Sequence, residues 1–425
     1  MGLLALVFED GGMKDTELYR QLLGLQSPWS VARVAVDLKA QRVDVWAEHS
    51  EGQHWPCPSC GQELALYDHT EERSWRHLDT MQFATYLHAR VPRVKCPKDG
   101  VHQVSTPWAE PRSRFTMLFE RLAIDVLLEM SVRGASRVLR ISWDEAEHLM
   151  HRAVSRGLKA KERRPLRYIG VDEKAVTRGR RFFTLVCDLE RGVIEHIADE
   201  RKIESLDSFF SARSREELSS LEAVALDMWP PYIASLRKNL PDADSKMVFD
   251  KFHIMRLVTT AVDTVRKREN REHRATGSTL LTGTKYLWVT GKERLNDRQR
   301  QRFSELKAVN LKTGRAWALK ESLREMWSYR SPSWALKFWR SWYGWAMRSG
   351  LEPMKREARM IAAHLPGVLT YFKHRITNAV AEGLNSKIQT VLKRAYGFRN
   401  LENFKTAIYF HCGGLRLHPA THTYP

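Results

Sequence analysis

The 425-residue sequence contains few cysteines, no long apolar run and no internal repeat. Its five cysteines are odd in number and unevenly spaced, which excludes the disulfide framework of a small secreted domain. No apolar stretch approaches the roughly 20 residues that a membrane-spanning helix requires. The apolar start at residues 2–8 lacks a basic leader and is too short for a signal peptide. We therefore expect a cytoplasmic protein that does not bind membranes.

Acidic residues are outnumbered by basic ones. The sequence has 50 Asp and Glu against 69 Lys and Arg, which gives a formal net charge of +19. Such an excess attracts phosphate groups, and release of their counterions supplies affinity that does not depend on sequence. Hydrophobic residues make up 43% of the chain, enough to form buried cores, and the length favours several domains. These features predict a multidomain protein with affinity for nucleic-acid phosphates, and the helix-turn-helix expected at 108–160 makes double-stranded DNA the predicted partner.

The N-terminal part of the chain has three distinct patterns. Alternating apolar and polar positions at 31–46 predict a β-hairpin, and the cysteine-bearing segment 57–102 follows it. Residues 112–156 have helical periodicity that is interrupted at Arg133-Gly134, and Ser142 begins a capping box for the second helix. We assign 1–107 to an N-terminal β/zinc-finger-like domain and 108–160 to a helix-turn-helix DNA-binding domain.

From residue 166 onward, strand and helix patterns alternate. Three antiparallel strands followed by two strand–helix units are typical of a ribonuclease H-like sheet. The stretch 252–369 has only helical patterns and contains half of the fourteen tryptophans, which we expect mostly to pack between helices. The predicted fold class is thus a multidomain α+β or α/β protein. We assign 166–251 to the first part of a catalytic core, 252–370 to a large all-helical insertion, and 371–425 to the second part of the core. The expected strands are 167–171, 181–186, 192–197, 221–226 and 247–249, with helices at 203–210 and 232–240.

Three acidic residues occupy positions from which they could face one pocket. Asp172 and Asp227 each follow an apolar strand, and Glu382 lies on a predicted helix at 375–395. Phosphodiester transfer needs an activated attacking oxygen and a neutralised leaving oxygen, which two divalent ions about 4 Å apart provide. Carboxylates suit Mg²⁺ or Mn²⁺, so we predict a two-ion site held by these three catalytic residues. A fourth acid, Asp250, either assists this site or caps the next helix, and we favour the cap. The helix face that carries Glu382 also includes Asn378, Asn385 and Gln389.

A second candidate metal site lies in the cysteine-bearing segment. Cys57 and Cys60 form a knuckle of two thiols followed by a glycine, and Cys96 supplies a third thiol. We predict that His102 completes a tetrahedral, structural Zn²⁺ site. The competing fourth ligands are His54, His77 and His88.

Basic side chains in three places are candidates for DNA contact, although solvation alone would also explain a basic helix face. The helix that begins at Ser142 presents His148, Arg152 and Arg156. The hairpin beside Asp172 carries Arg178, Arg180 and Arg181. Lys387 lies just beyond Glu382.

Four sequence blocks resemble the motifs of the ISL-three family of bacterial insertion-sequence transposases. They are 169–173 (IGVDE), 226–232 (LDMWPPY), 249–253 (FDKFH) and 378–388 (NAVAEGLNSKI), and the likeness runs from residue 14 to about 415. The resemblance implies a ribonuclease H-like DDE core whose acids are Asp172, Asp227 and Glu382, with a helical insertion before the Glu. It also implies a zinc-finger-like N-terminus, often with a Cys or His shortly after the third Cys. Asp99 occupies part of that loop here.

The resemblance further implies a bacterial, nucleoid-associated enzyme that binds terminal inverted repeats, nicks them by hydrolysis and joins a freed 3′ hydroxyl to target DNA. Pairing of two DNA ends implies a homo-oligomer, at least a dimer. Two alternatives share parts of the pattern: a structure-selective nuclease, and a DNA-binding regulator or domesticated, catalytically silent transposase.

Overall fold

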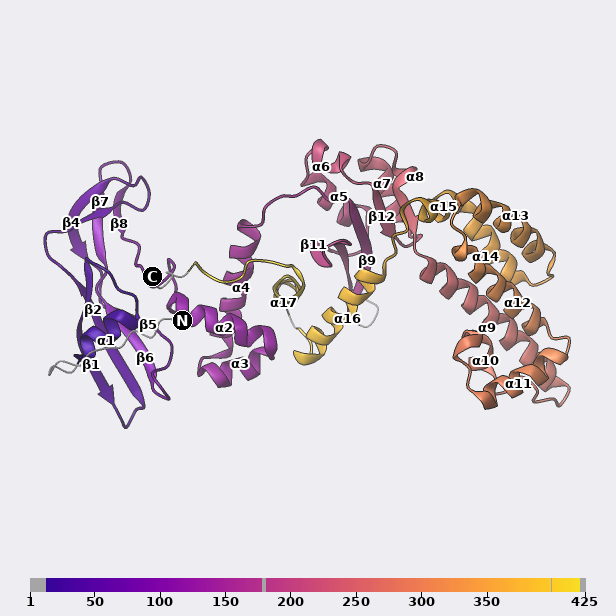
Figure 1. Cartoon of the computed structure of the whole chain (residues 1–425), viewed down its shortest axis with the longest axis horizontal. Helices are drawn as coiled ribbons and strands as arrows, with labels where there is room; N and C mark the ends of the chain where they lie inside the picture. Colours follow the sequence, from indigo (N-terminus) through magenta and orange to yellow (C-terminus); the bar gives the residue numbers. More distant parts are fainter. Residues whose placement is uncertain (1–12, 178–180, 399, 421–425) are drawn as a thin grey trace, which may run out of the picture. The chain divides into compact units, whose positions relative to one another are not determined.

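The computed structural model describes residues 13–177, 181–398 and 400–420, and the chain forms two compact units. The first unit contains the chain up to Lys161, together with Leu392–His411 and the segment from Leu415. The second contains Glu162–Val391 and Cys412–Gly414. Both helices and sheets are present, so the chain is a multidomain α+β protein, as predicted (Figure 1).

The N-terminal part of the first unit is built from two four-stranded sheets of order β1-β2-β6-β5 and β3-β4-β7-β8. β1 and β2 pair in antiparallel fashion, which confirms the hairpin predicted at 31–46. The core contains four buried tryptophans, among which the rings of Trp29 and Trp108 meet edge-on at 4.7 Å between centroids. The elements are α1 Asp15–Leu22, β1 Trp29–Asp37, β2 Arg42–His49, β3 His54–Pro56, β4 Glu63–His69, β5 Arg73–Arg76, β6 Ala84–Ala89, β7 Pro92–Cys96 and β8 Gly100–Gln103.

The helical part of the first unit contains α2 Met117–Glu129, α3 Val132–Leu139 and α4 Trp143–Lys159, with α17 Leu401–Cys412 against α4. The capping box at Ser142 is confirmed, since its side chain accepts from the Glu145 amide and the Glu145 side chain accepts from the Ser142 amide. The predicted interruption at Arg133-Gly134 occurs slightly earlier in the chain. α2 ends at Glu129 and Ser131 caps α3, so Arg133 and Gly134 belong to the first turn of α3. A second break follows at Arg140, which is left-handed with φ 55°.

The second unit contains a five-stranded sheet of order β11-β10-β9-β12-β13. β9, β10 and β11 are antiparallel neighbours, and β12 and β13 run parallel to β9, in agreement with the predicted strand sequence. β9 extends past its predicted end at residue 171 because Asp172, Glu173 and Lys174 all pair with β10. Asp172 therefore lies within the strand. The elements are β9 Tyr168–Thr177, β10 Arg181–Asp188, β11 Val193–Asp199, α5 Ile203–Ser211, α6 Arg215–Ser219, β12 Ala223–Leu226, α7 Pro230–Asn239, α8 Ala243–Lys246 and β13 Met247–Phe249.

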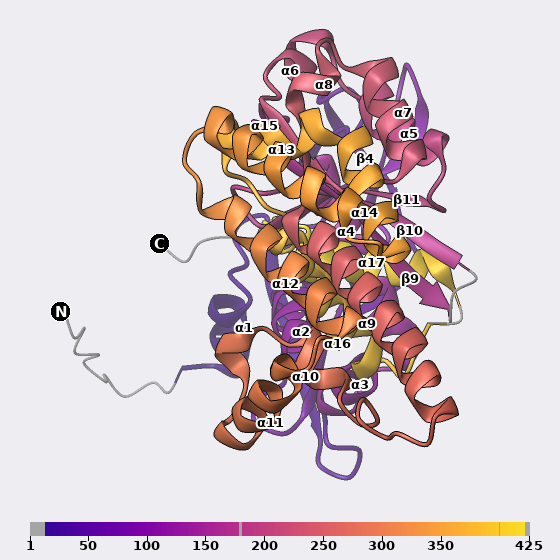
Figure 2. The same ribbon diagram turned by 90° about the vertical axis from the view of Figure 1, so that its right-hand side faces the viewer.

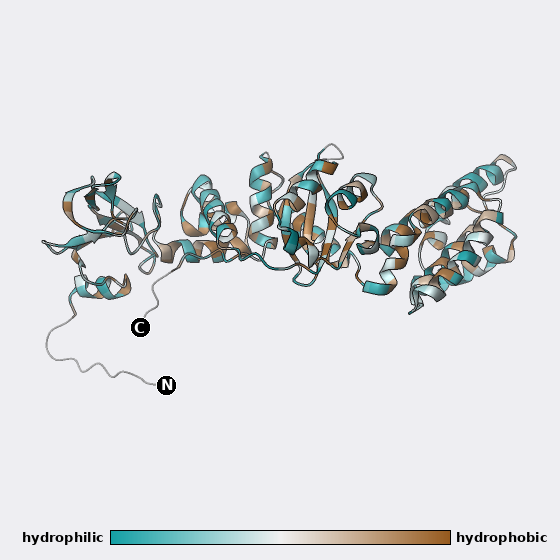
Figure 3. Cartoon of the chain, turned by 90° about the horizontal axis from the view of Figure 1, so that it is seen from above, coloured by the Kyte–Doolittle hydropathy of each residue, from teal (hydrophilic) through white to brown (hydrophobic). Residues whose placement is uncertain are grey.

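Between β13 and residue 374 the described elements are helical, as predicted (Figure 2). The long helix α9 packs against α12 and α14, and the bundle shares one apolar core with the sheet. Figure 3 shows apolar residues concentrated along the strands and on one side of many helices. Trp288, Trp317, Trp339 and Trp342 are buried, which confirms that most of these tryptophans pack between helices. The helices are α9 Lys251–Ala275, α10 Lys285–Val289, α11 Asp297–Ala308, α12 Lys312–Arg324, α13 Pro332–Arg348, α14 Glu352–Ala363 and α15 Leu365–His374, with short 3₁₀ turns at Lys292–Arg294 and Glu325–Ser328.

The chain then forms α16, Ala379–Arg394. Leu384, Ile388 and Val391 of its predicted apolar stripe are buried. Gly397 ends the helix with φ 101°, and its amide donates to the Leu392 carbonyl at 3.1 Å. Among the described residues, none of the helices combines the length and apolar character needed to cross a membrane.

Candidate functional site

The sheet brings Asp172 and Asp227 to the same level on neighbouring strands. β9 and β12 run parallel with Gly170 opposite Ala225. Two residues further along, Asp172 lies within β9 and Asp227 directly follows the end of β12. They line a cavity of about 60 Å³ together with Val171, Glu173, Arg201, Trp229 and Tyr232. Burial raises the pKa of Asp172 to about 6, and repulsion by the Asp227 carboxylate adds to the rise. This pair therefore carries unfavourable negative charge that a bound cation would offset.

His253 is the ion-pair partner of Asp227 in this structure. Its Nδ1 forms an ion pair with Asp227 Oδ1 from the first turn of α9. Burial opposes protonation of this imidazole, but the hydrogen bond to Asp227 outweighs it and raises the pKa of His253. His253 was not identified as a site residue from the sequence. Its position one helical turn after β13, the strand next to β12, could have indicated that it lies near Asp227.

Asp250 caps α9, as predicted. Its side chain is buried, and Oδ1 accepts from the Phe252 amide at 2.6 Å. The second oxygen accepts from the Asn378 amide at 2.8 Å, which ties the residue before α16 to the end of β13. The Asn378 side chain in turn lies so close to Gly170 that a Cβ there would be 2.7 Å from Asn378 Oδ1. The lack of a side chain at Gly170 thus permits this approach.

The polar face of α16 packs on β9. Asn385 Nδ2 donates to Asp172 Oδ2 at 2.6 Å. Lys174, two residues after Asp172 on the same side of the strand, donates to the Asn385 carbonyl at 3.1 Å and to Gln389 Oε1 at 3.0 Å. The helix face identified from the sequence is therefore the face that meets the strand. The contact between Asn385 and Asp172 was not predicted.

Glu382 lies on this same face, three residues before Asn385, and its side chain is exposed. The carboxylate of Glu382 is too far from those of Asp172 and Asp227 for the three to form a cluster in which all ligand atoms lie within 4.8 Å of one another. Among the described residues, only Cys57, Cys60 and Cys96 form such a cluster of three. The structure thus places the two aspartates together and Glu382 on the helix that covers them.

The donor set around Asp172 fits a hard divalent cation. Carboxylate oxygens from two strands face the cavity, and Mg²⁺ and Mn²⁺ prefer oxygen ligands. Asn385 Oδ1, on the side chain that contacts Asp172, is buried and accepts no hydrogen bond from the described residues. A cation or its bound water would satisfy this oxygen.

The thiols of Cys57, Cys60 and Cys96 form the second candidate site. Their sulfur atoms lie within 4.8 Å of one another, and those of Cys60 and Cys96 are 3.7 Å apart. Hydrogen bonds from the backbone amides of Cys60 and Ser59 lower the pKa of Cys57, which favours the thiolate that a metal requires. Three converging thiols fit Zn²⁺.

The structure does not place the predicted fourth ligand in this cluster. His102 lies on β8 opposite Val94, outside the group of ligand atoms, and its Nε2 is buried without a hydrogen-bond partner among the described residues. Of the competing histidines, His88 contacts Asp44 at 2.6 Å and His77 contacts Thr116 at 2.9 Å. His54 also lies outside the group.

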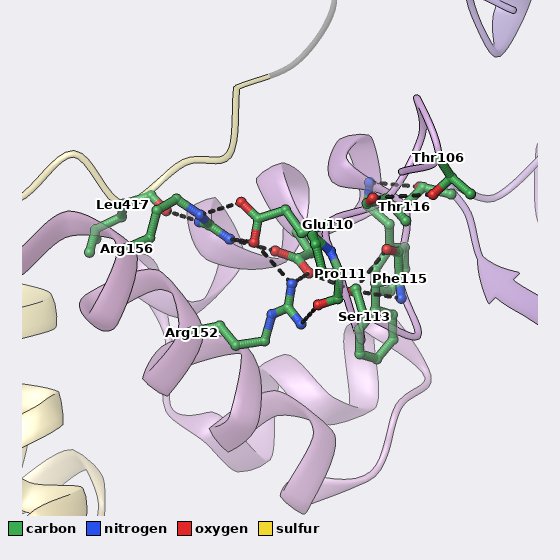
Figure 4. Close-up of polar contacts among 12 residues, drawn as sticks. Thr106, Glu110, Pro111, Ser113, Phe115, Thr116, Arg152, Arg156 and Leu417 are labelled. Atoms are coloured by element: carbon green, nitrogen blue, oxygen red, sulfur yellow. Dashed lines mark hydrogen bonds and ion pairs between the residues drawn. The ribbon is translucent and has the colours of Figure 1, made fainter. Parts of the chain in front are cut away.

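Two arginines of α4 that were predicted to contact DNA form ion pairs within their own unit (Figure 4). Arg156 binds Glu110 at 2.7 Å and the buried Glu120 at 2.8 Å, and Arg152 binds Glu110 at 2.9 Å. Burial favours the neutral form of Glu110, but the two guanidinium groups, Arg156 first, outweigh it and lower its pKa. These bonds connect α4 to Glu110 in the segment before α2 and to Glu120 on α2 itself, whereas His148 is exposed.

The remaining predicted DNA contacts occupy exposed positions or fall outside the described residues. Arg181 is exposed at the start of β10, and Lys387 is exposed on α16. Arg178 and Arg180 lie outside the described residues.

Comparison with known protein families identifies the family to which the chain belongs. Residues 169–408, more than half of the chain, match the ISL3 family described as "Transposase". Residues 53–99 match the zinc-finger of transposase IS204/IS1001/IS1096/IS1165, and residues 104–154 match the helix-turn-helix domain of transposase family ISL3. The chain belongs to the ISL3 family of insertion-sequence transposases, as its motif blocks predicted.

Two curated relatives, both transposases, are similar to this chain over most of their length. The transposase for insertion sequence element IS1001 of Bordetella parapertussis is 24% identical over 82% of this chain and 86% of its own. The transposase for insertion sequence element IS1557 of Mycobacterium tuberculosis (strain CDC 1551 / Oshkosh) is 25% identical over 91% of this chain and 93% of its own.

Proposed function

We propose that this transposase binds the terminal inverted repeats of its element and performs metal-dependent strand cleavage and strand transfer at Asp172, Asp227 and Glu382. The observation that carries the proposal is the placement of two carboxylates side by side at the cavity, with the pKa of Asp172 raised to about 6. Holding a buried carboxylate beside a second one costs folding free energy, and such arrangements are typical of functional sites where the acids bind cations.

The sheet order supports a ribonuclease H-like core, since three antiparallel strands are followed by two parallel ones with helices between them. We retain 166–251 and 371–425 as the two parts of this core, 252–370 as its insertion, and 1–107 and 108–160 as the domains that precede it. The helix-turn-helix match supports DNA as the partner.

Two bound Mg²⁺ or Mn²⁺ ions would supply an activated attacking oxygen and neutralise the leaving oxygen of the scissile phosphate. In this chain, Asn385 orients the Asp172 carboxylate by its 2.6 Å hydrogen bond, and His253 holds that of Asp227. Glu382, exposed one turn before Asn385, would complete the ligand set when cations and DNA are bound. Arg181 and Lys387, both exposed in the same unit, would contact DNA phosphates.

We further propose that Cys57, Cys60 and Cys96 hold a structural Zn²⁺ that stabilises the N-terminal domain for DNA positioning. The match to a transposase zinc-finger over residues 53–99 and the converging thiols support this assignment. Cleavage of two element ends in one reaction would require a homo-oligomer, at least a dimer, on the DNA.

The test is a cleavage assay on DNA that carries the flanking inverted repeats, with Mg²⁺, comparing Asp227→Asn with Glu190→Gln. Glu190 is an exposed acid that follows β10 of the same sheet. Asp227→Asn should reduce cleavage by at least about 10²–10³-fold, as loss of one transition-state contact does, while DNA binding persists. Glu190→Gln should retain both. Cleavage that survives Asp227→Asn would refute the proposed site.

A further inference from the structure

The cysteine-bearing segment contains the same five-residue turn twice. Residues 57–61 read Cys-Pro-Ser-Cys-Gly, and residues 96–100 read Cys-Pro-Lys-Asp-Gly. Both glycines have positive φ, 74° at Gly61 and 86° at Gly100, so the backbone leaves each turn in the same left-handed conformation. In this alignment Asp99 occupies the position that Cys60 occupies in the first turn.

The sheet places the two turns together. The first turn joins β3 to the start of β4, and the second joins the end of β7 to β8. β4 and β7 are antiparallel neighbours with Leu66 opposite Val94, so the start of β4 lies beside the end of β7. A hydrogen bond of 2.5 Å from Ser59 Oγ to Asp99 Oδ2 crosses between the turns. The Asp99 carboxylate is therefore hydrogen-bonded to the knuckle that contains Cys57 and Cys60. Like the ring nitrogens of His102 and His54, its oxygens lie outside the group of three sulfur atoms that are within 4.8 Å of one another, so ligation requires its side chain to turn toward them.

We propose that Asp99 is the fourth ligand of the zinc site, which gives a Cys₃Asp set. Zinc accepts a carboxylate oxygen at about 2.0–2.2 Å and forms closed tetrahedral structural sites. Because Asp99 is exposed, its side chain can rotate without displacing a packed neighbour. The rotation would replace the hydrogen bond from Ser59 with a bond from the carboxylate to the zinc ion. Each turn then contributes its first and fourth residues: Cys57 and Cys60 from one, Cys96 and Asp99 from the other.

The same alignment argues against His102. Its counterpart in the first turn is Glu63, an exposed residue of β4. On the β7–β8 ladder, His102 pairs with Val94, two residues away from Cys96, whereas Asp99 lies within the turn itself. Nε2 of His102 is buried and has no hydrogen-bond partner among the described residues, so His102 is the alternative fourth ligand. An experiment has to distinguish it from Asp99.

The assignment rests on the proposed zinc site, and the full-length protein tests both. Zinc content per chain is measured first, followed by Co²⁺ substitution and absorption spectra of the wild type, Asp99→Cys, Asp99→Asn and His102→Gln. Lys98→Ala, in the same turn, is the matched control. Competition with a zinc chelator gives the relative affinities, and circular dichroism confirms that each variant is folded.

Asp99→Cys should increase the sulfur-to-cobalt charge-transfer band by about one third, because the thiolate ligands increase from three to four. Asp99→Asn should weaken zinc binding by at least the roughly 10–100-fold that loss of an outer-shell partner causes. His102→Gln and Lys98→Ala should leave spectrum and affinity unchanged. Unchanged spectra in both Asp99 variants, or loss of zinc in His102→Gln, would overturn the assignment of Asp99 alone. A wild type that binds no zinc would overturn the zinc site and Asp99 with it.

Discussion

The cysteine cluster and the acidic site differ in how far the folded chain has assembled them. Three thiols already lie within 4.8 Å of one another on two adjoining turns of one sheet. The acidic site takes its residues from β9, the end of β12 and α16, and only Asp172 and Asp227 share the cavity. Glu382 is exposed on α16.

This difference follows from charge and protonation. Neutral thiols can approach one another without metal, and one of them, Cys57, already favours the thiolate through backbone hydrogen bonds. Carboxylates at neutral pH repel, and the pKa of Asp172 is raised first by burial and further by the neighbouring Asp227 carboxylate. A structural site can therefore form with the fold, whereas the third acid of a reactive site is expected to join only when cations and DNA phosphate are present.

Removal of zinc should produce the largest effect, because zinc contributes roughly 10–16 kcal/mol of apparent binding free energy in small zinc-finger peptides. We expect a chelator to abolish hydrogen-exchange protection in residues 54–103 while protection in the sheet of the second unit persists. Mass spectrometry of the exchanged peptides measures both regions in one experiment. Equal protection with and without zinc would mean that the tryptophan-rich core alone maintains this domain.

Glu382→Gln should reduce cleavage of inverted-repeat DNA by about 10²–10³-fold, similar to the loss of an electrostatic contact in a transition state. The variant should fold normally because the side chain is exposed. Glu402→Gln, an exposed acid on α17, is the control and should cleave like the wild type. Full cleavage activity in Glu382→Gln would show that Glu382 is not part of the catalytic site and that only Asp172 and Asp227 belong to it.

Glu110→Gln should lower the free energy of unfolding of the helix-turn-helix by about 1–3 kcal/mol at pH 7, the range for hydrogen bonds to charged groups. The pKa of Glu110 is lowered in the folded state, so its contribution is present above its ordinary value of 4.5 and disappears as pH falls below that value. Denaturant titrations at pH 7 and in acid should show the two proteins converging at low pH. A difference that does not depend on pH would contradict a charged Glu110–Arg156 pair.

Asn385→Ala should have the smallest effect on cleavage, about tenfold or less, because Asn385 positions Asp172 through one hydrogen bond worth about 1 kcal/mol. Measured against Ser386→Ala on the exposed side of the same helix, the reduction should be accompanied by a higher pKa of Asp172 in nuclear magnetic resonance titration. An unchanged Asp172 titration would show that the contact does not orient the carboxylate.

Features with a local signal were predictable from the sequence. β13 lies at Met247–Phe249 as expected, Asp250 caps α9, and three antiparallel strands are followed along the chain by two further strands, as the alternating patterns predict. The thiol cluster was recognisable from the spacing of Cys57 and Cys60 and the following Gly61.

Features that depend on distant partners were not predictable. β9 continues past Asp172 because β10 pairs with it, although its later residues are polar. The arginines of α4 looked suited to DNA, but Glu110, more than 40 residues earlier, binds them. The contacts of Asn385 and His253 with the two aspartates likewise join separate elements. The similarity between residues 57–61 and 96–100, which relates Asp99 to Cys60, is too short to be recognised from the sequence alone and becomes significant only because the sheet places the two turns side by side.

A crystal structure of the protein with a cleaved inverted-repeat end and Mn²⁺, with the ions located by anomalous scattering, would show whether the three acids hold two cations at the scissile phosphate. We expect two ions about 3.5–4 Å apart, with Asp172 and Asp227 as ligands and Glu382 bound to at least one of them. A complex in which the DNA end is seated at the aspartates while Glu382 stays beyond coordination distance would contradict this expectation.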